Sequence, residues 1–193
     1  MKKSDLQSNL TKSIQESTKT VQNTINLIPE LEQAIITMVR CISKGHKIVL
    51  FGNGGSAADA QHIAAELIGR FKLKRKSLPA IALTTDTSCI TALSNDYSFD
   101  IIFSRQCESL VNVDDVVIAI STSGNSKNIV KGLEMSKEKG AKTISLLGNS
   151  GGTIKNYSDI AIIVDSDVTA HIQEAHRVIY HTICNFVEKS LSE

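Results

Sequence analysis

Two short segments rich in glycine and serine have side chains and backbone suited to binding a ligand. They read Gly52-Asn53-Gly54-Gly55-Ser56 and Ser121-Thr122-Ser123-Gly124-Asn125-Ser126. Each follows a β-branched apolar run and precedes a helical pattern, so we expect both at the carboxyl ends of strands, where open α/β sheets bind ligands. Glycine lets the backbone approach an anion closely, and free N–H groups at a helix start favour phosphate. Either segment alone could be a plain turn with a helix cap, but the two together favour a phosphate site.

Neither segment has the pattern of a nucleotide-binding loop. No Gly-Lys-Ser/Thr ends either one, as a Walker A loop requires, and neither has the Gly-x-Gly-x-x-Gly spacing of dinucleotide-binding folds. The hydroxyl groups of the second segment add donors suited to phosphate oxygens. The pattern therefore favours a small phosphorylated ligand over a nucleotide.

Four more polar residues occupy positions from which they could share one cleft. His62 and Glu66 are four residues apart in the helical stretch after the first segment, and so lie on one helix face. Gln173 and His181 are eight residues apart in the last helical stretch, which places them roughly 80° apart around the helix. Two imidazoles, a carboxylate and an amide oxygen could hold Zn²⁺ or a similar ion. The carboxylate could equally act as a base beside a carbonyl group, and both roles stay open.

Short β-branched runs supply the elements that would position these residues. They are continuous rather than alternating, as expected for strands buried on both faces of a parallel sheet. Helical stretches separate them, which predicts right-handed βαβ crossovers and an α/β fold, a three-layer αβα sandwich around a five-stranded parallel sheet. The five predicted strands are 47–51, 80–84, 116–120, 143–147 and 160–164, and the last helix is predicted at about 169–191.

The first 44 residues predict two helices ahead of this core. Apolar residues of the first helix recur at helical spacing in a single stripe: Leu6, Leu10, Ile14, Val21, Ile25 and Ile28. Pro29 opens the second helix and Gly45 ends it. Residues 1–193 are then a single domain, with 1–44 used in oligomerisation and 45–193 as the α/β core. The stripe is too apolar to face water on a monomer, so we expect it to pack against another subunit.

Composition narrows the class of protein. Lys and Arg number 21 against 20 Asp and Glu, aromatic residues make up 4% and Trp is absent, which disfavours a nucleic-acid partner. The polar N-terminus has no apolar stretch of a signal peptide, and no run approaches a membrane span, so we expect a cytoplasmic protein with no membrane partner. The cysteines match no zinc motif or Cys-x-x-Cys pattern and are expected to be free thiols, largely buried.

Three further features have ordinary structural interpretations. Arg70–Lys76 is the one basic cluster, and a solvated loop is its expected role, with steering of an anionic substrate or a protein contact as the alternatives. Asp86 follows the second predicted strand and is expected to cap a helix, with contact to a sugar as the alternative. His176 lies three residues after Gln173, and a structural role is favoured over support of a metal site.

Several of these motifs, taken in order, resemble the sugar isomerase (SIS) domain of the phosphoheptose isomerases. The resemblance spans nearly the whole chain and includes the two leading helices. Its motifs are Gly52–His62 with Ala65–Leu67, Asn95-Asp96, Ser121–Ser126 and Ile172–His176. It implies an aldose–ketose isomerase that converts D-sedoheptulose 7-phosphate to D-glycero-D-manno-heptose 7-phosphate, for nucleotide-activated heptose used in lipopolysaccharide or capsule. It also implies a homotetramer with one zinc ion in each subunit.

The resemblance also assigns roles to positions of this sequence. The implied metal ligands are His62, Glu66, Gln173 and His181. Glu66 is the candidate base for the carbon proton and His181 the acid/base for the oxygens. The implied contacts to the sugar phosphate are Asn53, Gly54, Gly55, Ser56, Glu66, Asn95, Asp96, Ser121, Thr122, Ser123, Ser126 and Gln173.

The sequence departs from the family pattern at one position, and two alternative functions stay open. Family members often carry Arg where this chain has His171, which affects the expected substrate fit more than the reaction type. A related SIS protein binds the bacterial replication initiator without turnover, but it lacks equivalents of Glu66 and His181 and carries Arg at the position of Ser123. The other alternative is an isomerase of another sugar phosphate, such as a pentose phosphate.

Overall fold

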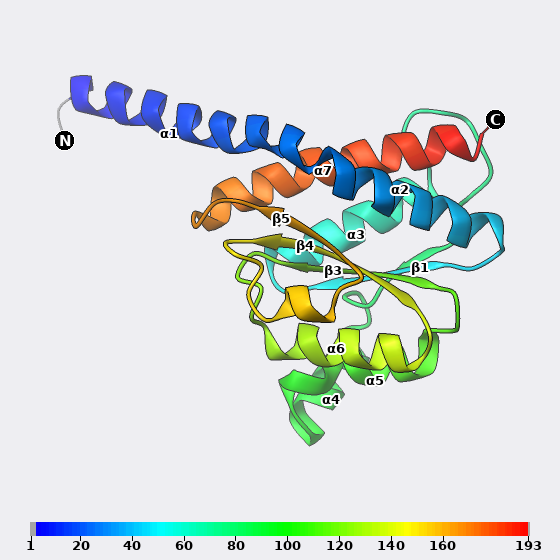
Figure 1. The fold of residues 1–193 in the computed structure, drawn as a ribbon. Helices are drawn as coiled ribbons and strands as arrows, with labels where there is room; N and C mark the ends of the chain where they lie inside the picture. Colours follow the sequence, from blue (N-terminus) through cyan, green and yellow to red (C-terminus); the bar gives the residue numbers. More distant parts are fainter. Residues whose placement is uncertain (1–2, 193) are drawn as a thin grey trace.

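The computed structural model describes residues 3–192, and its centre is a parallel sheet with helices on both faces (Figure 1). Within these residues the strand order is β2-β1-β3-β4-β5, with all neighbours parallel. The strands are β1 (Ile48–Gly52), β2 (Ala80–Ala82), β3 (Val116–Ser121), β4 (Lys142–Gly148) and β5 (Ile160–Val164). The predicted α/β sandwich with a five-stranded parallel sheet is therefore confirmed.

The strand order places the two glycine- and serine-rich segments side by side. β1 and β3 are neighbours, and Gly52 at the end of β1 pairs with Ile120 near the end of β3. The chain crosses from one side of the sheet to the other at this pair of strands, since β2 flanks β1 and β4 flanks β3. Ligands bind at such a switch point in open α/β sheets.

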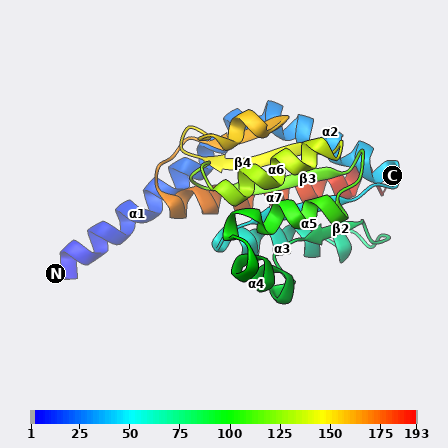
Figure 2. The same cartoon turned by 90° about the horizontal axis from the view of Figure 1, so that it is seen from below.

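Helices cover the sheet in two layers (Figures 1 and 2). One core cluster joins the sheet to α2 (Ile28–Ser43), α3 (Gly55–Ile68) and α7 (Thr169–Ser190). A second cluster joins the other face to α5 (Ile102–Leu110) and α6 (Lys127–Glu138), with α4 (Thr87–Asp96) beyond them. Short 3₁₀ turns cover 24–27, 99–101 and 154–157. The β-branched residues of the central strands β1, β3 and β4 are buried between these layers, which explains their continuous apolar runs, whereas Ile81 in the edge strand β2 is exposed.

The first helix, α1 (Lys3–Asn23), extends beyond the rest of the fold at its N-terminal end (Figure 2). Its C-terminal part contacts α7, where Ser17 donates a hydrogen bond to Glu174. The predicted apolar stripe faces outward along most of its length, and Leu10 and Ile14 are 54% and 67% exposed. Val21 alone of the six stripe residues packs on the core among the described residues. Apart from Val21, the stripe residues thus pack on no core residue in the described part of the chain.

The predicted elements match the observed ones closely, with small differences at their ends. Pro29 lies in the first turn of α2, and Gly45 follows that helix with φ +85°. Strand β2 ends at Ala82 instead of Thr84, because it is an edge strand where the chain turns towards α4. Asp86 caps α4 by accepting a hydrogen bond from the Cys89 N–H at 2.9 Å, as expected. In the described part of the chain, no helix is both long and apolar enough to span a membrane.

Candidate active site

The loop after β1 leads directly into α3. Gly54 has φ +55°, a left-handed conformation that favours glycine, and α3 begins at the next residue. The side chains of Asn53 and Asn128 exchange two hydrogen bonds of 2.9 Å, which tie this loop to the first turn of α6. Asn53 is predicted to contact the sugar, and its side chain is already hydrogen-bonded to Asn128, just after the loop that follows β3.

The loop after β3 uses part of its hydroxyl groups to hold its own shape. Ser121 accepts a hydrogen bond from the Gly124 N–H at 3.2 Å, and Ser123 accepts one from the Asn125 N–H at 3.3 Å. Gly124 has φ +67° and lies against the Gly151 carbonyl, so no larger residue fits there. The hydroxyls of Thr122 and Ser126 form no hydrogen bond to another described residue. Both hydroxyls are free to bind a ligand, and Ser121 and Ser123, which act only as acceptors here, still have a proton to donate to one.

Helices α3 and α7 bring three of the four predicted metal ligands together. His62 Nε2 lies 3.0 Å from Glu66 Oε1 and 3.5 Å from His181 Nε2. The ligand atoms of all three residues lie within 4.8 Å of one another. A zinc ion about 2 Å from each ligand atom requires separations of roughly 3–4 Å, so the donor set fits such an ion, and both distances from His62 Nε2 fall in this range.

The environment of His181 favours a neutral imidazole. Burial lowers the pKa of His181, and the neighbouring His62 lowers it further. Its ring lies edge-on to Tyr180 at 4.7 Å between centroids and beside Phe71 at 5.7 Å. A neutral ring at neutral pH has a lone pair that can bind a metal or accept a proton.

Gln173 lies on the same helix but nearer to the first loop. A Cβ atom placed on Gly55 would lie 2.5 Å from Gln173 Nε2, so the amide rests directly on the start of α3. The two residues line a hollow of about 170 Å³ together with Asp59 and Arg177. Gln173 is two helical turns before His181, which places it at the loop end of the site rather than inside the histidine–glutamate cluster.

Asn95 and Asp96 end α4 and are exposed. Asn95 Nδ2 donates to Asp96 Oδ1 at 2.9 Å. Among the described residues, neither side chain forms a hydrogen bond to the loops after β1 and β3. Their predicted contact with the sugar stays a prediction.

Asp59 and Tyr180 support the cluster and were missed by the sequence analysis. Both are buried, and the Tyr180 hydroxyl lies 3.3 Å from Asp59 Oδ1 and 3.3 Å from His62 Nδ1. Burial raises the pKa of the Tyr180 phenol, and the charge of Asp59 adds to this effect, so the hydroxyl keeps its proton. The sequence signal that could have identified them is their position: Asp59 is three residues before His62, and Tyr180 directly precedes His181.

His176 has the structural role that was favoured. It is fully buried, and its Nε2 lies 3.0 Å from the Leu147 carbonyl, while its Nδ1 has no partner among the described residues. Burial lowers the pKa of His176, and this keeps the ring neutral. His176 thus joins α7 to β4 and is not part of the cluster of His62, Glu66 and His181.

The interpretation of Arg70–Lys76 as a solvated loop was wrong for one residue. The lysines of this segment are exposed, but the Arg75 side chain is 5% exposed and pairs with Glu188 on α7. Arg75 also donates to the carbonyls of Glu66 and Leu67, and so closes the C-terminal end of α3. The positive charge of Arg75 stabilises the fold, because it compensates the buried negative charge of Glu188.

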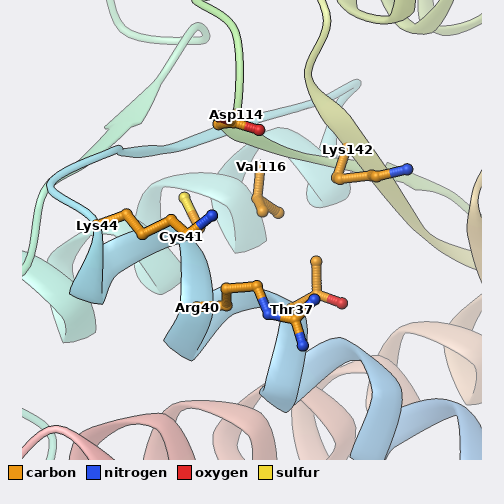
Figure 3. Close-up of a pocket in the computed structure, with 7 residues that line it drawn as sticks. All are labelled: Thr37, Arg40, Cys41, Lys44, Asp114, Val116 and Lys142. Atoms are coloured by element: carbon orange, nitrogen blue, oxygen red, sulfur yellow. The ribbon is translucent and has the colours of Figure 1, made fainter.

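A cavity of about 220 Å³ lies at the amino-terminal ends of β3 and β4, away from the loops that follow β1 and β3 (Figure 3). It contains Val116 and Lys142 at the starts of β3 and β4, with Arg40 and Lys44 at the end of α2. Cations at the C-terminus of a helix complement its dipole, which accounts for this pair. None of the predicted site residues lines the cavity.

Known proteins of one family are similar to this chain over most of its length. A family model described as "SIS domain" matches residues 11–148. A phosphoheptose isomerase of Citrifermentans bemidjiense is 54% identical over 165 residues, which cover 86% of both chains. A solved phosphoheptose isomerase from Francisella tularensis superimposes with a TM-score of 0.92 at 38% identity, over 98% of this chain and all of that one. One from Neisseria gonorrhoeae has a TM-score of 0.90 at 39% identity, over 95% and 99% of the two chains.

Proposed function

Because this chain belongs to the SIS-domain family, and within it to the phosphoheptose isomerases, we propose that it converts D-sedoheptulose 7-phosphate to D-glycero-D-manno-heptose 7-phosphate. It is an aldose–ketose isomerase of heptose biosynthesis. The observation that carries the mechanism is the convergence of His62, Glu66 and His181 within 4.8 Å. The product serves the synthesis of nucleotide-activated heptose for lipopolysaccharide or capsule.

The reaction moves one proton between two neighbouring carbons. Glu66 removes a proton from C1 of the ketose, which yields an enediolate. The neutral His181 takes the proton of the C1 hydroxyl and gives it to the C2 oxygen, and Glu66 returns its proton to C2, which completes the aldose. Both residues end the cycle in their starting protonation states, as acid–base catalysis requires.

One zinc ion in each subunit is the cofactor that this donor set fits. His62, Glu66 and His181 would hold it, and we propose Gln173 as the fourth ligand. When bound, zinc polarises the carbonyl oxygen and stabilises charge that develops on it. The grouping of the His62 and His181 Nε2 atoms with the Glu66 carboxylate is the chemical support for this assignment.

The two loops at the switch point hold the phosphorylated substrate. Thr122 and Ser126 offer uncommitted hydroxyls, and Ser126 precedes α6, whose N-terminus favours an anion. Ser121 and Ser123 shape the same loop. The complete set of substrate contacts that we propose is Asn53, Gly54, Gly55, Ser56, Glu66, Asn95, Asp96, Ser121, Thr122, Ser123, Ser126 and Gln173.

The active form is a cytoplasmic homotetramer in which residues 1–193 form one SIS domain and 1–44 mediate assembly. Two features support this. The apolar stripe of α1 is exposed at Leu10 and Ile14. An apolar groove of about 530 Å³ between α2 and α7 is lined by residues such as Ile35 and Phe186. Closed symmetry is the usual way to cover such surfaces. Residues of α7 would then complete a neighbouring subunit's cleft.

A substrate panel followed by NMR tests the function. The protein should convert sedoheptulose 7-phosphate to the aldoheptose 7-phosphate and leave pentose phosphates unchanged. Turnover of a pentose phosphate in preference to the heptose would overturn the substrate assignment. Tight binding of the bacterial replication initiator without any isomerisation would overturn the enzyme assignment.

A further inference from the structure

Tyr180 connects the metal-ligand candidates to a buried carboxylate. It lies on α7 directly before His181, and its side chain is 1% exposed. Its hydroxyl lies 3.3 Å from His62 Nδ1 and 3.3 Å from Asp59 Oδ1. Asp59 and His62 are three residues apart on α3, so both face α7. The three side chains form a chain of contacts that ends at the imidazole of His62.

The direction of these hydrogen bonds follows from the groups at each end. The Asp59 carboxylate is 2% exposed and accepts hydrogen bonds only, and Arg177 Nε lies 3.5 Å from its Oδ1. The Tyr180 hydroxyl therefore donates its proton to Asp59. The phenolic oxygen is then left as the acceptor towards His62, so His62 Nδ1 carries a proton and donates it. The opposite direction would leave Asp59 facing a phenolic oxygen with no proton between them.

A proton fixed on Nδ1 decides what the other nitrogen of His62 can do. Nε2 is the atom that lies 3.0 Å from Glu66 Oε1 and 3.5 Å from His181 Nε2. With Nδ1 protonated, the neutral ring has its lone pair on Nε2, inside the cluster of ligand atoms, where a bound metal ion would lie between it and the Glu66 carboxylate. Without Tyr180, the Glu66 carboxylate would favour a proton on Nε2, where it blocks the lone pair.

We propose that Tyr180, oriented by Asp59, is a positioning residue that keeps His62 in the Nδ1-protonated tautomer and presents the Nε2 lone pair to a metal ion. This inference rests on the proposed metal-dependent isomerase. Groups that hydrogen-bond a ligating histidine orient its ring and set its tautomer, and their loss usually weakens metal binding by about 10- to 100-fold. Tyr180 acts through His62 and does not itself touch the substrate.

The test compares Y180F with Y157F, since both remove a phenolic hydroxyl and keep the ring. Tyr157 lies in the 3₁₀ turn at 154–157, away from the cluster. Zinc affinity is measured by competition with a chromophoric chelator. Y180F should bind zinc about 10- to 100-fold more weakly than the unmodified protein, and Y157F should bind it equally well. Unchanged affinity in Y180F, or an equal loss in both variants, would overturn the proposal.

A second measurement needs neither zinc nor turnover. Two-bond ¹H–¹⁵N spectra of the metal-free protein, with His62 assigned through H62Q, show which ring nitrogen carries the proton. The unmodified protein should have it on Nδ1, and Y180F should shift it towards Nε2. A proton on Nε2 in the unmodified protein would refute the inference. If the unmodified protein bound no zinc at all, the proposed cofactor would fail, and these spectra would still decide the role of Tyr180.

Discussion

Arg75 Nε lies 3.0 Å from Glu188 Oε1, and both side chains are buried. The Glu188 carboxylate also accepts hydrogen bonds from the backbone N–H groups of Phe71, Lys72 and Leu73, at 2.6–2.8 Å. This one carboxylate therefore holds the loop after α3 against the last helix. The same loop places the Phe71 ring beside His181, 5.7 Å between centroids, so the fold of the loop and the wall of the site are linked.

The first prediction concerns the stability that this ion pair provides. E188Q should lower the free energy of unfolding by about 3 kcal/mol, because it leaves the buried Arg75 guanidinium without a counter-charge. Urea denaturation at neutral pH measures the change. E108Q is the matched control: Glu108 forms an exposed pair with Arg105, and its loss should cost less than about 1 kcal/mol. Equal effects of the two substitutions would contradict this account.

The second prediction is the pH dependence of the same effect. Burial raises the pKa of Glu188, but the three N–H donors and Arg75 outweigh burial, and the pKa lies below its ordinary value of 4.5. The unfolded chain then binds a proton more readily than the folded one, so the contribution is complete above about pH 4.5 and is lost as the pH falls through the folded pKa. The stability difference between the unmodified protein and E188Q should narrow as the pH falls below about 4.5. A gap that stayed constant over this range would show that Glu188 is not the titrating group.

The strands could be predicted from the sequence, and so could the site residues that are close to each other along the chain. The β-branched runs indicated the strands because burial on both faces removes the need for polar residues. The His62–Glu66 pair was visible because four residues form one helical turn. Asp59–Tyr180 and Arg75–Glu188 were not, since their partners are separated by more than 100 residues and meet only when α7 packs on α3. Without its partner, Arg75 looked like one more cation of an exposed loop.

The third prediction separates the two roles of Glu66. E66Q should reduce turnover of sedoheptulose 7-phosphate at least 100-fold, because an amide cannot take the C1 proton. Zinc content measured on the same sample then distinguishes the roles: zinc retained with turnover lost indicates a base, and zinc lost indicates a ligand. E138Q, at the exposed end of α6, should retain full activity. Near-normal turnover by E66Q would exclude Glu66 as the base.

The fourth prediction uses the contact between Gly55 and Gln173. In G55A the new methyl group would lie 2.5 Å from Gln173 Nε2, so the amide has to move away. Alanine suits the first turn of α3, and the stability should change by less than about 1 kcal/mol. Activity should fall by roughly tenfold or more, because small misplacements of a positioning group are costly.

A double-mutant cycle identifies the cause of that loss. Q173A alone should reduce activity, and G55A should add little further loss in the Q173A background, since the side chain that it displaces is already gone. Fully additive losses would mean that Gly55 acts through the backbone of the loop after β1 instead of through Gln173.

The last prediction links assembly to activity through the stripe on α1. Leu10 and Ile14 are 54% and 67% exposed in the single chain, and neither contacts its core. Changing both to Asp should therefore leave the fold of one chain intact while it places charges in the contact between subunits. Size-exclusion chromatography with light scattering should give a mass near four times 20.9 kDa for the unmodified protein and a smaller mass for the variant. If α7 of one subunit completes a neighbour's cleft, the variant also loses isomerase activity.

Ser8 and Gln15 lie on the opposite side of α1, so S8D/Q15D adds the same charge and should keep both the tetramer and the activity. A monomeric L10D/I14D protein with full activity would show that each subunit holds a complete site, and assembly would then have no part in catalysis.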